Sequence, residues 1–184
     1  MNKLFLLFAL NFIFLNKIDA QENALKVGVS CVDVSPTIFP IQLRSGKSSY
    51  VHDPLHVRAV AFESGEGRAV ICLIDAIGIG REMSDIAKSK AAKKTGWKTE
   101  EMLICATHTH SAPKGGTGMP GREAYEKLKH DKLEEAIVLA IERLKPAKVG
   151  FSSEDEPSEV RNRRWFLEPG TMPPNPLGEK DQVK

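Results

Sequence analysis

The sequence predicts an α/β domain in which helices pack on a mixed β-sheet. Short runs typical of strands alternate with two longer stretches in which apolar residues recur with the period of a helix, about 3.6 residues. The length fits this class, because 184 residues is the size of a single domain. The last thirty residues are rich in proline and do not follow the alternation.

The first expected strand covers residues 25–34, where apolar residues alternate with small or polar ones. Its apolar face is expected to carry Val27, Val29 and Cys31. The run ends at a Ser-Pro pair, which stops a strand. Residues 37–53 show no period and are expected to form a long loop.

A hairpin and a helix are expected next. Strands over residues 55–63 and 68–74 flank a Ser-Gly-Glu-Gly turn, and the second strand is almost continuously apolar, which is typical of a central strand. A helix of about four turns follows, with Met83 on its apolar side and Gly96 as its stop.

The remaining expected elements are a strand, a long helix and a last strand. The strand covers residues 101–106, and a helix over residues 122–145 carries an apolar stripe and ends at Pro146. A last strand is expected over residues 147–152.

The two ends of the sequence differ from this domain. Residues 1–20 have a positive start and an apolar run shorter than the roughly 20 residues of a membrane span, which predicts a cleaved signal peptide and a secreted or periplasmic protein. The α/β portion is expected over residues 21–152. A proline-rich irregular segment, cut short, is expected over residues 153–184.

Charge and motif content exclude some classes of partner. The formal net charge is +2, so no strong positive field argues for nucleic acid. The string Gly116–Gly121 matches GxGxxG, but the acidic residue needed about twenty positions later falls within a helix, which disfavours a dinucleotide site. The oligomeric state is not predicted.

His108 and His110 give the sharpest chemical signal. They follow an expected strand at a spacing of two, so both side chains are expected to leave one face and to converge on one metal ion. Ligands of open α/β sheets bind at this edge. If residues 68–74 lie parallel alongside, Asp75 reaches the same edge, as a metal ligand or as an acceptor for an imidazole N–H. A purely structural role of the pair is the alternative.

Other histidines and the cysteines carry weaker signals. His52 and His56 are interpreted as loop or strand-surface residues. Cys31, Cys72 and Cys105 lie in apolar runs and are interpreted as small buried side chains, with one disulfide and a spare thiol as the alternative.

Residues 107–116 (THTHSAPKGG) resemble the THTHSGPGG signature of the neutral/alkaline non-lysosomal ceramidases. The resemblance covers most of residues 26–165. Further segments resemble the family in the same order: Val27-Gly28, Asp33–Pro36, His52–Leu55, Arg58-Ala59 and Asn162-Arg163.

The resemblance implies the amino-terminal part of a larger, zinc-dependent amidohydrolase domain. His108 would be a zinc ligand, His110 would line the catalytic pocket and Arg163 would contact the substrate. In the family, zinc activates a water that cleaves the amide of an N-acylsphingosine into sphingosine and a fatty acid. The implied partner is a ceramide-like lipid amide, and peripheral contact with a membrane stays open.

The chain also departs from the family pattern. The second histidine, the glutamate and tyrosine ligands and the serine of the family lie further along than this chain extends, so the chain alone is expected to be inactive. Ala112 and Lys114 replace small residues of the signature loop.

Two other functions stay open. One is an exported metallohydrolase with Asp75 as third ligand and an ester or phosphate substrate; the other is a non-catalytic exported binding module. An apolar slot leading to the histidine pair would favour a lipid amidase, whereas a cationic, polar slot would favour a phosphatase.

Overall fold

The computed structural model describes residues 24–44, 46–113, 121–159, 168 and 170–179. These residues fall into two compact units that divide between Lys148 and Val149. The expected signal peptide over residues 1–20 lies outside the described residues, so it stays a prediction, as does the expected domain division after residue 152.

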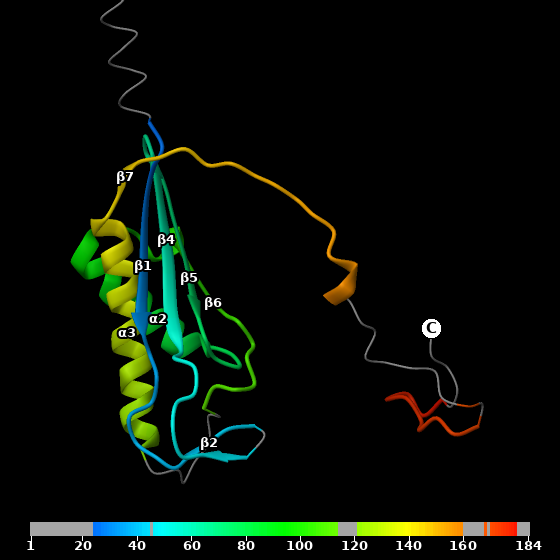
Figure 1. Ribbon diagram of the computed structural model, residues 1–184. Coiled ribbons are helices and arrows are strands. Elements are labelled where there is room, and N and C mark those ends of the chain that lie inside the picture. Colours follow the sequence, from blue (N-terminus) through cyan, green and yellow to red (C-terminus); the bar gives the residue numbers. More distant parts are fainter. Residues whose placement is uncertain (1–23, 45, 114–120, 160–167, 169, 180–184) are drawn as a thin grey trace, which may run out of the picture. The chain divides into compact units, whose positions relative to one another are not determined.

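The described residues of the first unit form two α-helices, a short 3₁₀ turn and two sheets. Figure 1 shows their arrangement. A five-stranded sheet has the order β6-β5-β4-β1-β7, and a two-stranded sheet pairs β2 with β3. The elements are β1 Lys26–Asp33, β2 Ile41–Gln42, β3 Lys47–Ser48, β4 His56–Ser64, β5 Gly67–Ile74, α2 Arg81–Thr95, the 3₁₀ turn η1 Thr99–Glu101, β6 Met102–Ala106, α3 Arg122–Glu142 and β7 Lys145–Pro146.

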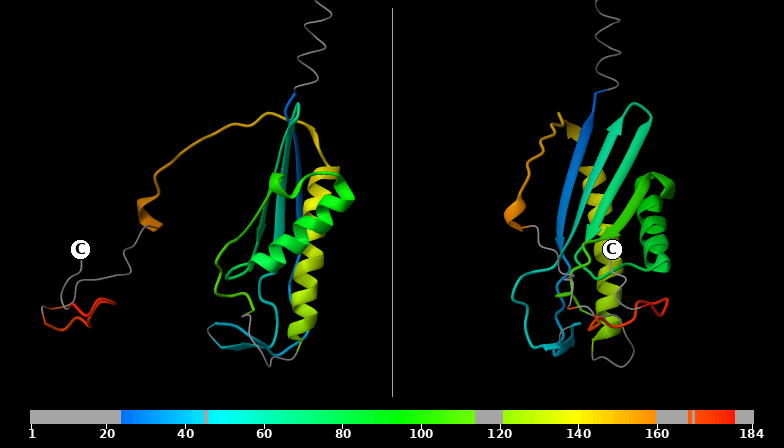
Figure 2. Two further views of the ribbon diagram at one scale, coloured as in Figure 1. Left: turned by 180° about the vertical axis from the view of Figure 1, so that it is seen from behind. Right: turned by 90° about the vertical axis from the view of Figure 1, so that its right-hand side faces the viewer.

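The sheet is mixed, which confirms the predicted α/β class. Strand β4 pairs antiparallel with both β1 and β5, whereas β5 and β6 are parallel and joined through α2. Both helices cover the same side of the large sheet (Figure 2). The expected hairpin, both helices and the strands β1 and β6 are present within a few residues of their predicted bounds.

The core lies between the sheet and the two helices. Alternate residues of the central strands face the helices, and the largest of these side chains are fully buried. Its fully buried members include Val57, Ala59, Ala61, Val70, Cys72, Ile74, Leu133, Ala136, Ile137 and Ala140.

Strand β1 lies directly against the backbone of α3. A Cβ atom at Gly28 would meet the carbonyl oxygen of Ala140 at 1.9 Å, so only glycine fits there. Two residues along, the Ser30 hydroxyl donates a hydrogen bond to the Ala136 carbonyl oxygen at 2.7 Å. Small residues therefore set the distance between β1 and α3.

The expected inner face of β1 was wrong. Val29 is 57% exposed and Cys31 is also exposed, while Gly28 and Ser30 of the alternate set are buried under α3. The alternation itself is present, but helix α3 packs on the face that carries the small residues Gly28 and Ser30. Among the cysteines only Cys72 is buried, and all three thiols are free, so neither interpretation of the three cysteines holds in full.

Two other expectations need correction. The expected loop over residues 37–53 contains β2 and β3, which are too short to show a period. Helix α3 ends at Glu142, and the last strand is the two-residue β7, so residues 147–152 contain no strand. The residue before a proline avoids helical geometry, which places Lys145 and Pro146 in an extended stretch beside β1.

The described residues of the second unit hold little regular structure. Its described part contains the 3₁₀ turn η2 Pro157–Glu159 and a turn in which the Asn175 side-chain oxygen accepts the backbone N–H groups of Leu177 and Glu179. Within the described ranges, no helix is both long and apolar enough to span a bilayer.

The two faces of β5 predict unequal effects of one substitution. Ile74→Ala is expected to lower the free energy of unfolding by about 2–5 kcal/mol, because it opens a cavity in the core. Ile71→Ala is expected to cost less than about 1 kcal/mol, because this side chain is 47% exposed on the uncovered face. Urea unfolding monitored by circular dichroism measures both values, and equal losses would contradict the assignment of the two faces.

Candidate functional site

The candidate site lies where β5 and β6 end. The two strands are parallel, as expected, and the Thr107 N–H donates to the Ile74 carbonyl oxygen at 3.0 Å, just beyond their last pair. Asp75 follows β5 and the THTHS segment follows β6, so both reach the same edge of the sheet. The predicted meeting of these two segments is confirmed.

The rings of His108 and His110 are neighbours. Their centroids are 5.1 Å apart with an interplanar angle of 65°, and both residues are exposed. The expected cause of this closeness was wrong, because β6 ends at Ala106 and His108 has a positive φ of 61°. A left-handed backbone is uncommon for a residue other than glycine. A loop conformation, and not strand alternation, therefore brings the rings together.

A backbone carbonyl fixes the orientation of His108. Its Nδ1 lies 2.7 Å from the carbonyl oxygen of Ile77, in the segment between β5 and α2. The carbonyl can only accept, so Nδ1 carries the proton and the neutral ring has its lone pair on Nε2. Metal-binding histidines commonly make such a contact through their other nitrogen.

The Asp75 carboxylate already accepts hydrogen bonds from groups of this chain. Its Oδ2 accepts hydrogen bonds from the His56 backbone N–H and from Arg58 Nη1, each at 2.9 Å. Burial works to raise the pKa of Asp75, but these two donors outweigh it and hold the pKa below its ordinary value. The expected contact of Asp75 with an imidazole N–H is absent for His108, whose N–H goes to Ile77.

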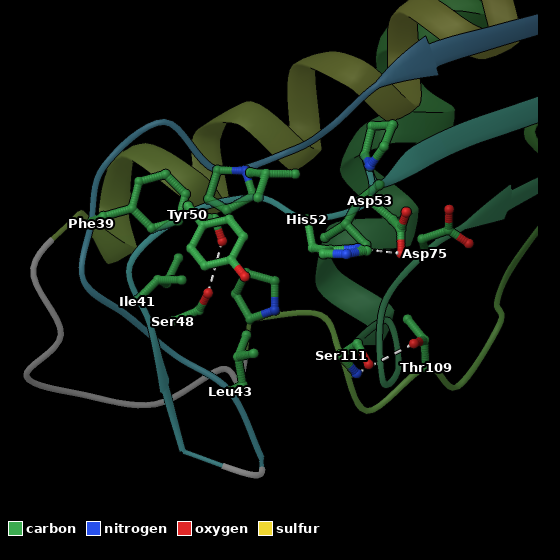
Figure 3. A pocket seen from close by; sticks show the side chains of 15 residues that line it. Phe39, Ile41, Leu43, Ser48, Tyr50, His52, Asp53, Asp75, Thr109 and Ser111 are labelled. Atoms are coloured by element: carbon green, nitrogen blue, oxygen red, sulfur yellow. Dashed lines mark hydrogen bonds and ion pairs between the residues drawn. The ribbon is translucent and has the colours of Figure 1, made fainter.

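A pocket of about 610 Å³ lies beside this edge (Figure 3). Phe39, Ile41 and Leu43 gather at one end of it, whereas Asp75, Thr109 and Ser111 lie at the other. Its lining residues are Pro36, Phe39, Ile41, Leu43, Ser48, Tyr50, Val51, His52, Asp53, Pro54, Leu55, Asp75, Thr109, Ser111 and Pro113. The pocket is therefore amphipathic, and none of the described residues that line it is a lysine or an arginine.

Sequence reasoning missed most of this pocket. Residues 37–53 form much of its wall, yet they were expected to be an irregular loop. The signal available was the series of bulky apolar residues Phe39, Ile41 and Leu43, spaced by two. Thr109 and Ser111 line the pocket, while the histidines that alternate with them do not.

The other candidate residues are placed as follows. His52 is exposed, lines the pocket and lies 3.0 Å from Asp53; His56 is part-buried in β4, 3.1 Å from the Arg58 guanidinium. Arg163 lies outside the described residues, as do Lys114 and most of the GxGxxG string. The described residues contain no group of three or more histidine, cysteine, aspartate or glutamate side chains that could hold a metal ion.

Two solved structures share this fold. The neutral ceramidase from Pseudomonas aeruginosa matches with a TM-score of 0.60 and 20% sequence identity. A ceramidase complexed with C2 matches with a TM-score of 0.58 and the same identity. Each match covers 67% of this chain and 22% of the solved chain.

The chain has the fold of a ceramidase segment. It spans 22% of the length of these two ceramidase chains, and at 20% identity the likeness concerns the fold alone. No protein-family model matches the sequence. No curated protein matches it either.

The partly buried Asp75 carboxylate predicts an acid-dependent stability. Asp75→Asn is expected to lower the free energy of unfolding at pH 7 by about 1 kcal/mol, because the charged acceptor of Arg58 is lost. A depressed pKa stabilises the fold above the unfolded value, and that contribution disappears as the pH falls below about 4. The difference between the original chain and the variant should therefore shrink between pH 5 and about 2 in urea unfolding experiments.

Asp53→Asn is the matched control. The Asp53 side chain is 88% exposed, so this variant should unfold like the original chain at every pH. An Asp75→Asn variant as stable as the control at pH 7 would contradict the role given to Asp75.

Proposed function

We propose that this chain forms part of the site of an exported, zinc-dependent amidohydrolase that cleaves N-acylsphingosine-like lipids into sphingosine and a fatty acid. The observation that supports this most directly is the pair of exposed, adjacent imidazoles of His108 and His110. They follow a parallel strand pair, next to an amphipathic pocket. The fold shared with ceramidases agrees with the proposal.

The histidine pair suits a zinc ion as part of its ligand set. Among the described residues, His108 has a partner only at Nδ1, which the Ile77 carbonyl holds, and metal-binding histidines commonly have this arrangement. In the proposal, His108 binds zinc and His110 stands beside the reacting atoms. A catalytic zinc site usually has three protein ligands, so the proposal requires further ligands from elsewhere in the protein.

Zinc bound to His108 would lower the pKa of a water molecule to about 7 and polarise the amide carbonyl. The chain's own residues would position the substrate. His110 has an exposed ring from which a nitrogen can exchange a proton with the substrate. Arg163 is proposed to hold the polar head group through its guanidinium.

The pocket chemistry favours a neutral lipid amide over a phosphate ester. Phe39, Ile41 and Leu43 offer apolar surface for an acyl chain. Asp53 at the polar end would repel an anionic group, and no described lining residue is a lysine or an arginine; the charge of Asp75 is already paired with Arg58. A soluble phosphate ester is therefore a poor fit.

The proposal predicts weak zinc binding that depends on His108. The chain is expected to bind about one zinc ion, and His108→Ala should weaken binding at least about tenfold, because a first ligand is lost. Competition with a chromophoric chelator measures the affinity. His52→Ala is the control, since His52 is 81% exposed and is bound to Asp53. Unchanged zinc affinity in His108→Ala would refute the assignment.

The pocket predicts selective binding of ceramide. A fluorescent short-chain ceramide should bind the chain, and Leu43→Asn should weaken it about threefold or more through lost apolar contact, as measured by fluorescence anisotropy. A ceramide 1-phosphate analogue should bind less tightly, because its phosphate would face Asp53 in a lining with no described lysine or arginine.

Leu103→Asn is the matched control for this measurement. Leu103 is 56% exposed on the uncovered face of the sheet, away from the pocket lining. Equal losses in Leu43→Asn and Leu103→Asn would mean that the lipid adsorbs to the open sheet, and would contradict the pocket assignment.

A further inference from the structure

A second pocket, of about 280 Å³, lies where both helices begin. The segment before α2 supplies Gly78 and Gly80, and the first turns of α3 supply Arg122, Tyr125 and Lys129. Neither helix has a side-chain cap: α2 begins after Gly80 and α3 after Gly121. The first N–H groups of a helix have no partner within the helix and favour an anion.

Two buried donors of this pocket have no hydrogen-bond partner among the described residues. Tyr125 is only 6% exposed, and its hydroxyl is buried and unpaired. Arg122 Nε is also buried and unpaired. A tyrosine hydroxyl is a donor at neutral pH in any case, and burial raises the pKa of Tyr125 above its ordinary value, as do the nearby charges of Glu126, Asp75 and Asp33.

The charge balance of the pocket is positive. Glu126 is its acidic lining residue, and Lys129 neutralises it through a contact of 2.9 Å between Nζ and Oε1. The same ammonium lies 5.3 Å from the centre of the Tyr125 ring. The guanidinium of Arg122 is therefore left to attract an anion.

We propose that this pocket binds a small oxyanion, a carboxylate or a phosphate group, through the Tyr125 hydroxyl and Arg122. Both unpaired donors belong to residues that line this pocket, and an oxyanion has several acceptor oxygens to offer them. The two uncapped helix ends add a favourable field.

The anion would bind next to the anchor of the histidine pair. Ile77 lines this pocket, and its carbonyl oxygen accepts the His108 Nδ1 proton at 2.7 Å. The inference does not rest on the proposed amidohydrolase activity, because it concerns different donors. It is tested without zinc and without a lipid.

The chain offers a built-in reporter, because Tyr50 and Tyr125 are its two tyrosines. The 184-residue chain labelled with 3-fluorotyrosine should give two ¹⁹F resonances, assigned by Tyr50→Phe and Tyr125→Phe. Titration with sodium phosphate or sodium acetate should shift the Tyr125 resonance saturably and leave that of Tyr50 in place. Sodium chloride at equal ionic strength is the reference, and a tighter response to phosphate or to acetate identifies the group preferred.

Two variants with the same change in net charge distinguish binding in this pocket from general electrostatic attraction of the anion to the protein. Arg122→Met should weaken binding of the anion about tenfold, because a charged donor is lost. Lys93→Met makes the same change in net charge in the last turn of α2, and should bind like the original chain. Far-UV circular dichroism checks the fold of each variant. Equal weakening in both variants, or shifts no larger than with sodium chloride, would overturn the inference.

Discussion

The parallel pairing of β5 with β6 determines where the candidate functional groups lie. The two strands are joined through α2, so both run in the same direction and end at one edge of the sheet. That edge carries Asp75 and the histidine pair, while the segment entering α2 supplies the Ile77 carbonyl that holds His108. Helix α2 begins at the same edge, because a helix that returns the chain to a parallel strand must start where the first strand ends. Both pockets border this edge, although residues 37–53 form much of the wall of the larger one.

The sheet's contact with α3 explains both a success and an error of the sequence analysis. The continuous apolar run of β5 correctly predicted a central strand, since each of its faces carries apolar side chains. In β1 the alternation was equally clear, but a period of two does not say which face meets the helix. The close approach of the α3 backbone decides this, because it admits Gly28 and Ser30 and has no room for the valines of the other face. Val29 and Leu103 are left on the uncovered side of the sheet.

The candidate site was predictable in its residue types and less so in its geometry. A short apolar strand followed by two histidines placed the pair at the sheet edge, and the structure agrees. The left-handed conformation of His108 and its carbonyl partner were not predictable, because a backbone acceptor leaves no mark in the residue types. The pocket wall over residues 37–53 has strands of only two residues, and the spacing of Phe39, Ile41 and Leu43 by two marks this wall without marking where the strands begin and end. The unpaired Tyr125 hydroxyl likewise depends on packing, since its sequence position shows only a helical apolar stripe.

The two pockets differ in electrostatic character although Pro113 lines both. The larger one has apolar walls and two carboxylates, and its described lining has no lysine or arginine; the smaller one has Arg122 and Lys129 beside two helix N-termini. Asp75 lines the larger pocket and not the smaller one. The Arg58 guanidinium and the His56 N–H hold its carboxylate on the side of the larger pocket. The two proposals thus assign a neutral amphipathic molecule and a small anion to different pockets. The difference in charge preference between the two pockets follows from the elements that form them. The strand ends supply side chains to the larger pocket, whereas the helix N-termini supply N–H groups to the smaller one and favour negative charge.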